Sequence, residues 1–467
     1  MSYGNQYSNK PFERASKTSH TGMINDSAVK EFLGTCRTPP SRSDIDDRSI
    51  VFQEAGEVSN NPIKHIITVD GGYSNIVVEE AFPSSTITFF QFGVLFFSLS
   101  DLLELKEKPF IDPDDFKKMQ EIEKLKLVLP TKGVFVDGQR SLTASVRKSL
   151  YDFFMKRTEK DKNKNKNKNK NKNKNKNRKT FTFMESLKWL LFEEYGNNPS
   201  KQWHLARCPH CECGLDFRAH DLDIFFTVRC RECGGEVYLT DVFRLHEAMD
   251  DELGASGISG YLATAVEQIA IVSLIHHMLE NFPSLLENTL FVKDGPLAFF
   301  GQTANLHKPM RNLMRYLDEH HAIYMVGLEK SGPFVEHAAQ ISEILSERQF
   351  VVLGNKHIYK YIIPGAPADG RPYADTSYYG NKVIFKSELG NVYVATLPNL
   401  ESKPEPTRED CLNIDVVLQN VTALKCDLYY SSLVPIVIAN KLISLSDHPS
   451  SDVLRRFARE NVSANGK

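Results

Sequence analysis

The fold is decided by the stretch KHIITVDGG, residues 64–72. Its apolar, β-branched run predicts a buried strand that ends in Asp70, followed by a turn at the two glycines. The stretches NIVVEE (75–80) and TITFFQFGVLFF (86–97) are β-branched and aromatic, and they lie at hairpin distance. We therefore expect three consecutive strands in an antiparallel meander.

The second half of the chain alternates between helical and strand patterns. We expect a helix at 261–280, a strand at 289–294, a helix at 305–320 and a strand at 322–328. A helix at 333–345, a hairpin at 382–397 and a last helix at 432–446 follow. Without the long insertion at 101–255, this leaves a mixed sheet of about five strands with helices between them. This order of elements predicts an α/β protein with a ribonuclease H-like mixed sheet.

Two aspartates close predicted strands, and a glycine follows each of them. They are Asp70 in TVDGGYS and Asp294 in VKDGPL. Carboxylates at the ends of neighbouring strands can share a divalent cation, and phosphodiester hydrolysis uses such ions, often as a pair about 4 Å apart. The alternative is that each Asp-Gly pair only marks a turn.

Several motifs in this order resemble the NurA nuclease family, whose pattern they follow at 62–100 and 257–446. They are DGGYS after the first strand, KDGPL after the long helix, VGLEKSG (326–332) after the next strand, and LVPIVIANKL (433–442) near the C-terminus. The resemblance implies the NurA fold and an exonuclease or endonuclease that trims DNA ends with manganese or magnesium. It also implies a homodimer that works with a HerA-type hexameric DNA-translocating ATPase.

The resemblance also assigns site residues. Asp70 and Asp294 are the expected metal ligands, and Asn440 stands where the family places a polar metal-site residue, although an asparagine offers only a neutral oxygen. Lys330 follows a strand of the same sheet and could neutralise a phosphate or the charge of the transition state; the alternative is a solvated loop lysine. Tyr429 or Tyr430 would supply the family's tyrosine.

The family also expects an acidic residue on the helix that precedes Asp294, and two residues compete for this role. The strand at 289–294 should run opposite to that helix, so the helix's N-terminal part lies near Asp294. Glu267 is in this part, whereas Glu280 lies in the last turn, about 20 Å further along by helical rise. Geometry therefore favours Glu267 as the third ligand, although a surface glutamate is the alternative.

A cysteine cluster predicts a second metal site. The four residues Cys208, Cys211, Cys230 and Cys233 have the two-by-two spacing of a zinc ribbon. Four thiolates leave no open position, so this Zn²⁺ should be structural, and Cys213 is a spare thiol or an alternate ligand. The ribbon region (201–250) carries six basic and nine acidic side chains, which favours a scaffolding role over DNA binding. The adjacent helix histidines His276 and His277 face different directions and are interpreted as structural.

The expected organisation has five parts. A polar, largely disordered segment covers 1–60, the nuclease core covers 61–100 and 256–450, and a tail covers 451–467. The insertion at 101–255 holds the ribbon (204–240) and a Lys-Asn tract (162–179). The tract predicts disorder and is interpreted either as a tolerated expansion or as a lysine arm that grips DNA.

Charge and hydropathy limit the possible partners. The tract from Lys162 to Lys179 holds ten basic and no acidic residues, so the rest of the chain has 47 basic and 59 acidic side chains, a balance of −12. Such a body is not a general binder of polyanions, so we expect DNA to need a local patch, metal ions or a partner. The chain has neither a secretory signal nor a run of eighteen uncharged apolar residues, which predicts a cytoplasmic protein away from membranes.

Three functions remain open at this point. The first is the metal-dependent deoxyribonuclease, in DNA repair or in antiviral defence against foreign DNA. The second is a non-catalytic zinc-ribbon adaptor or scaffold of a DNA-translocase complex. The third is an actin-like phosphotransferase, which would need a second glycine-rich phosphate loop that the sequence does not show.

Overall fold

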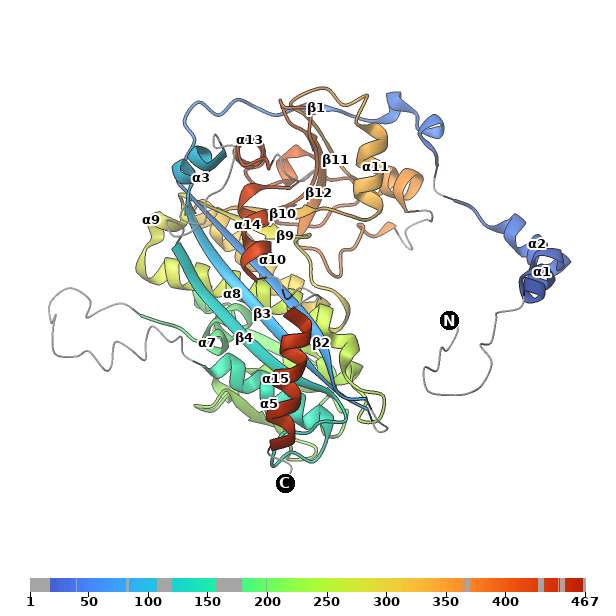
Figure 1. Ribbon diagram of the computed structural model, residues 1–467. Helices are drawn as coiled ribbons and strands as arrows, with labels where there is room; N and C mark the ends of the chain where they lie inside the picture. The colour runs from blue at the N-terminus through green and yellow to red at the C-terminus, as the bar shows by residue number, and fades with distance from the viewer. Residues whose placement is uncertain are drawn as a thin grey trace.

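A computed structural model describes most of the chain as an α/β protein built on one large mixed sheet (Figure 1). It describes residues 17–38, 40–80, 84–106, 120–156, 179–198, 200–363, 365, 370–426, 432–443, 445 and 450–464. The Lys-Asn repeats, Tyr429 and Tyr430 lie outside the described residues. The nine strands follow the order β1-β11-β12-β13-β10-β9-β2-β3-β4.

The sheet combines a long antiparallel meander with a shorter mixed half. The meander is β2 (His65–Glu79), β3 (Ser85–Ser98) and β4 (Gln120–Lys132). At its other edge β2 pairs in parallel with β9 (Thr289–Asp294), which pairs in parallel with β10 (Tyr324–Glu329). Antiparallel strands complete the sheet: β13 (Val392–Pro398), β12 (Gly380–Lys386), β11 (Gln349–Val352) and β1 (Gln53–Glu54).

Helices cover both faces of the sheet, because strand side chains alternate between two apolar clusters. On one face, residues such as Ile67 and Phe291 pack with α8 (Ser259–Asn281). On the other, residues such as Ile66 and Val292 pack with α13 (Ile414–Ala423) and α14 (Val434–Ile443). Further helices of the described chain include α3 (Leu99–Lys106), α9 (Pro283–Leu286), α10 (His307–His320), α11 (Pro333–Ile341) and α12 (Asn355–His357).

The first predicted strand is too short in our sequence interpretation. The expected turn at Gly71 and Gly72 is wrong, because β2 continues through both glycines and pairs with β3 along its whole length. The third strand of the meander, β4, comes from the insertion and was missed, as were β1 and β11. The sheet has nine strands instead of about five. The mixed α/β class is confirmed, whereas the ribonuclease H-like assignment stays a prediction.

The insertion is built into the body of the molecule. Its helices α5 (Leu142–Met155) and α7 (Phe183–Leu191) pack with α8, and four short strands form two hairpins: β5 (Gln202–Leu205) with β6 (Leu215–Arg218), and β7 (Thr227–Arg229) with β8 (Glu236–Tyr238). Ribbon residues Trp203 and Phe217 belong to the same apolar cluster as these helices.

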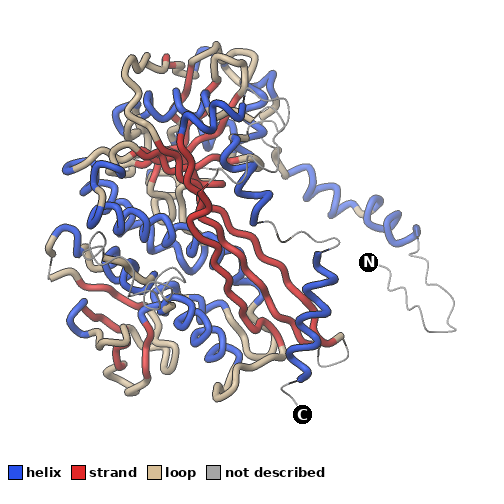
Figure 2. Tube along the Cα trace, turned by 60° about the vertical axis from the view of Figure 1, so that its left-hand side comes forward, coloured by secondary structure: helices blue, strands red, loops and turns tan. Residues whose placement is uncertain are grey.

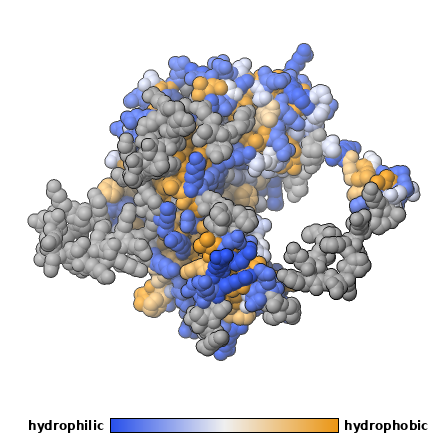
Figure 3. All heavy atoms as spheres, in the orientation of Figure 1, coloured by the Kyte–Doolittle hydropathy of each residue, from blue (hydrophilic) through white to orange (hydrophobic). Residues whose placement is uncertain are grey.

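Both ends of the described chain carry helices. α15 (Ser450–Ala464) packs along β2, beside the three long strands (Figure 2). At the other end α1 (Lys17–Asn25) and α2 (Ser27–Thr35) form a pair that stands apart from the body (Figure 1) and presents apolar side chains to solvent (Figure 3).

One helical segment, Ser256–Asn281, is long and apolar enough to cross a membrane by length and composition alone. Inside the protein, 72% of its most apolar window is buried, because α8 packs against the sheet and α7. This burial is what a core helix requires.

Candidate metal centre

The two aspartates lie side by side where β2 separates from β9. The parallel pairing ends at Val69 and Lys293, so Asp70 and Asp294 occupy the next position on each strand. Asp70 is therefore within a continuous strand, whereas Asp294 ends its strand. Side chains alternate between the two faces along a strand, and both aspartates fall on the face that α14 covers. Both carboxylates therefore lie on that side of the sheet.

Lys330 and Asn440 complete this side of the site. Lys330, which directly follows β10, forms an ion pair from Nζ to Asp294 Oδ2 at 2.7 Å. Asn440 on α14 lies between the carboxylates. When its amide oxygen accepts from Lys330 Nζ at 3.0 Å, its Nδ2 donates to Asp70 Oδ2 at 2.6 Å. In the opposite orientation Nδ2 lies 3.4 Å from Asp294 Oδ2.

Glu267 approaches the site from α8, on the opposite face. Gly71 lets it come close, because a Cβ atom there would lie 3.0 Å from Glu267 Oε1 and 2.6 Å from Phe92 Cδ1. The other carboxylate oxygen, Oε2, lies 3.2 Å from Lys293 Nζ. Lys293 Nζ also donates to the backbone oxygen of Asp294 at 2.7 Å, so this lysine connects Glu267 with the end of β9.

The carboxylates influence one another strongly. Burial, together with the negative charges of Glu267 and Asp294, raises the pKa of Asp70 to about 7. Burial also raises the pKa of Glu267, and Lys293 opposes this shift. Asp70 and Glu267 therefore resist ionisation, and a hard divalent cation beside them would supply the missing positive charge.

The structure therefore brings Asp70, Glu267, Asp294, Lys330 and Asn440 to one region, with Glu267 on the opposite face of the sheet from the two aspartates. Glu280 lies elsewhere, near the C-terminal end of α8, and its carboxylate pairs with Lys179. The three acids are nevertheless not a compact ligand group. In the part of the chain that the structure describes, only the cysteines bring three or more ligand atoms close enough to count as a ready metal site.

Lys293 is the residue that the sequence analysis missed. It is only 3% exposed, although it is charged. A signal was present, because Lys293 interrupts the otherwise apolar run TLFV just before the aspartate, at a strand position that should face the core.

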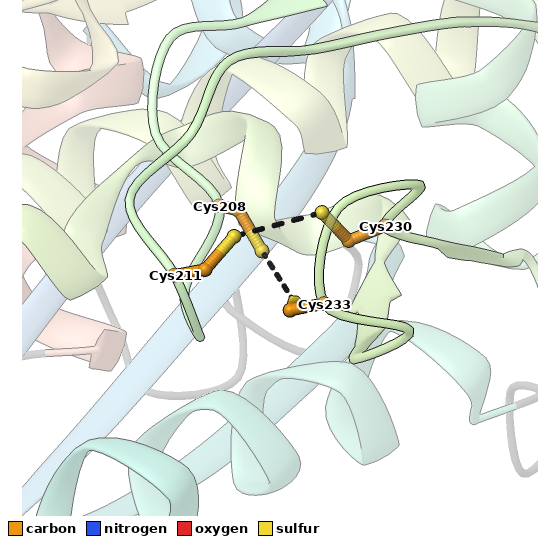
Figure 4. Close-up of side chains that lie close together, drawn as sticks. All are labelled: Cys208, Cys211, Cys230 and Cys233. Carbon is orange, nitrogen blue, oxygen red and sulfur yellow. Dashed lines mark hydrogen bonds between the residues drawn. The ribbon is translucent and has the colours of Figure 1, made fainter.

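The four cysteines form the second candidate metal site (Figure 4). Their sulfur atoms all lie within 4.8 Å of one another, with Cys208–Cys233 at 3.9 Å and Cys211–Cys230 at 3.7 Å. The edge of a tetrahedron of sulfur atoms around Zn²⁺ is about 3.8 Å, given a Zn–S distance of about 2.3 Å. Backbone N–H groups of Cys233 and Glu232 lower the pKa of Cys230 to about 7, which favours the thiolate. These residues fit a structural zinc ion.

Comparisons with solved structures find NurA nucleases. The NurA nuclease from Sulfolobus solfataricus matches 97% of this chain and 98% of its own, with 6% identity and a TM-score of 0.35. A second NurA structure matches 92% of this chain and 91% of its own, with 10% identity and a TM-score of 0.23. A structure of NurA bound to dAMP and manganese matches 93% of this chain and 95% of its own, with 12% identity and a TM-score of 0.21. No protein-family model and no curated protein matches the chain. Scores this low do not establish a shared fold, so the function proposed below rests on the site.

Proposed function

We propose that the protein is a divalent-metal-dependent deoxyribonuclease of the NurA type. The observation that carries this proposal is that Asp70 and Asp294 lie side by side where β2 separates from β9, with Lys330 beside them and Glu267 approaching Gly71 from the opposite face. Buried carboxylates raise one another's pKa values when they share a site, and the cation that relieves this repulsion is also the one that phosphodiester hydrolysis needs.

Each residue has a role that follows from its position. Asp70 and Asp294 would bind Mn²⁺ or Mg²⁺, which supplies activation of water and neutralises charge on the phosphate. Asn440 orients the Asp70 carboxylate through its amide. The Lys330 side chain is 30% exposed, so its ammonium group can reach a phosphate from the solvent side. Glu267 adds negative charge from the α8 face, next to Gly71.

The test is cleavage of linear DNA by the zinc-loaded protein with Mn²⁺, with Mg²⁺, and with neither ion. We expect DNA to be degraded only with the divalent ion, and D70N and D294N to lose this activity. Metal-independent cleavage, or full activity of both variants, would contradict the proposal.

The partners are also a proposal. We infer that a dimer of this chain works with a HerA-type hexameric DNA-translocating ATPase, in repair or in defence. The negative balance of the body supports a need for a partner that delivers DNA.

A non-catalytic scaffold is the second candidate function. It is favoured by the two lysines that already pair with the acids, Lys293 with Glu267 and Lys330 with Asp294. Binding of Mn²⁺ that D70N abolishes would separate the two functions, because a scaffold that has lost its metal site would bind none there.

A further inference from the structure

Lys293 is a buried charge that the proposed nuclease function does not use. A buried ammonium group is costly unless it is paired and hydrogen-bonded. Lys293 meets this requirement with two contacts, to Glu267 Oε2 at 3.2 Å and to the backbone oxygen of Asp294 at 2.7 Å. Its ammonium group thus lies between an acid of the site and the strand end that carries another.

Glu267 is satisfied by the chain itself. One carboxylate oxygen faces Lys293, and the other lies over Gly71, whose own backbone N–H donates to Asp70 Oδ1 at 2.9 Å. Asp70 and Asp294 are arranged differently, because they project from the α14 face toward Asn440 and the partly exposed Lys330. The acids therefore lie on two sides of the sheet: Glu267 pairs with the buried Lys293 on the α8 face, whereas Asp70 and Asp294 share the α14 face with the partly exposed Lys330.

The formal charges agree with this division. Three carboxylates and the two ammonium groups of Lys293 and Lys330 leave a charge of −1. One divalent cation would bring the site to +1, which a single phosphodiester balances. Two divalent cations would leave +3 in a largely buried place, where excess charge is costly.

We propose that Lys293 takes the place of a second divalent cation beside Glu267, so that the site holds a single divalent cation, between Asp70 and Asp294. Lys293 is then a positioning residue that fixes Glu267. This inference rests on the proposed nuclease function, and it differs from the pair of ions that the sequence analysis expected.

The consequence can be tested by removing the lysine's charge. K293M keeps a side chain of similar length at a buried position, but it leaves Glu267 without a cationic partner. A second divalent cation should then bind beside Glu267. The double variant K293M/E267Q removes both charges, so its site should return to a single cation, and K293R should keep one cation because the positive charge remains.

The experiment counts Mn²⁺ bound per chain by electron paramagnetic resonance, on the zinc-loaded full chain without DNA. We expect one Mn²⁺ for the wild type, two for K293M, and one for both K293M/E267Q and K293R; D70N/D294N should bind none. Two Mn²⁺ in the wild type would overturn the inference and leave the nuclease proposal standing, and this count does not depend on how K293M folds. One Mn²⁺ in a folded K293M would also overturn it. No bound Mn²⁺ in the wild type would overturn both proposals.

Discussion

Asp70 shows how a proposed metal ligand can work against the stability of its own fold. An unfolded aspartate ionises near its usual pKa of 3.8, whereas the folded side chain ionises near 7. Above pH 7 both states are ionised, and the folded state carries the whole cost of burying the charge, about 4 kcal/mol at 1.36 kcal/mol per pKa unit. Below pH 4 both states are protonated and the cost disappears. The contribution of Asp70 to the unfolding free energy of the metal-free protein should therefore fall as pH rises from 4 to 7.

The first prediction is that D70N stabilises the metal-free protein while it abolishes cleavage. The asparagine cannot ionise, so its unfolding free energy should exceed that of the wild type by up to about 4 kcal/mol at pH 8 and by little at pH 4. Denaturant unfolding at the two pH values measures this difference. D137N, at an exposed position, is the control and should show no such pH dependence. A wild type that is as stable as D70N at pH 8 would show that Asp70 is not destabilised.

The second prediction concerns the glycine that admits Glu267. In G71A the new Cβ would lie 2.6 Å from the Phe92 ring and 3.0 Å from Glu267, so one of the two must move. Because Phe92 is fully buried, we expect lower stability by about 1–3 kcal/mol together with weaker Mn²⁺ binding. The neighbouring G72A is a matched control, since its Cβ would come no closer than 3.8 Å to other atoms. Equal Mn²⁺ affinity in the two variants would separate Gly71 from the site.

The same residues show what the sequence could and could not predict about the site. Asp294 lies at a strand end as predicted, and helical rise places Glu267 nearer to it than Glu280. Asp70 lies inside β2 instead of at a strand end, and the metal roles of all three acids stay predictions. Lys293 could have been noticed as a charge within an apolar strand, but its partner could not be predicted, since only the position of α8 shows which acid it meets. Pairings across sheet faces depend on tertiary packing, which local patterns do not contain.

At the scale of elements, β2 is the clearest difference between expectation and structure. Two glycines inside an apolar run predict a turn, yet here they lie within a strand of fifteen residues. Close packing explains Gly71: Glu267 and Phe92 lie so near its backbone that a larger side chain would not fit. The glycine is there to make room for these side chains and does not mark a turn. The helices that follow Gly260 were predictable, because their periodic patterns are long and glycine or proline often marks their ends.

The ribbon is fixed to α5 by a buried ion pair. Arg147 Nε and Nη2 bond to the two carboxylate oxygens of Asp241 at 2.8 and 2.7 Å, and Nη2 also donates to the backbone oxygen of Glu236 at 3.0 Å. Cys208 and Cys230 belong to the apolar cluster that α5, α7 and α8 share. The four-cysteine site and the core are therefore coupled through packing.

The third prediction is that zinc loss destabilises more than the ribbon. C230S should lower the unfolding free energy by at least about 4 kcal/mol, and hydrogen exchange should increase in α5 and α7 as well as at the cysteines. C213S is the matched control, because Cys213 is exposed and outside the four-sulfur cluster, so its zinc content and stability should equal those of the wild type. Faster exchange confined to residues 204–240 would show instead that the ribbon unfolds alone.

At the scale of the whole molecule, charge and surface both point to assembly with a partner. Outside Lys162–Lys179 the chain has a balance of −12, so long-range attraction to DNA is weak. The α1–α2 pair exposes four large apolar side chains, each more than 60% exposed: Met23, Ile24, Phe32 and Leu33. Exposed apolar groups that cluster on one small unit are typical of protein contacts.

The last prediction joins these two features. Cleavage of linear DNA should be slow with the protein alone and at least about tenfold faster with the proposed HerA-type ATPase and ATP, because translocation would replace the missing electrostatic attraction. The double variant I24S/F32S should lose both the acceleration and the co-elution with the ATPase, while its Mn²⁺ binding and thermal stability stay unchanged, since neither side chain is buried in the body. L389S is the matched control, because Leu389 is also more than half exposed but lies in the β12–β13 turn. Equal cleavage rates with and without the ATPase would contradict the dependence inferred from charge. A wild-type response in I24S/F32S would show that the partner binds elsewhere.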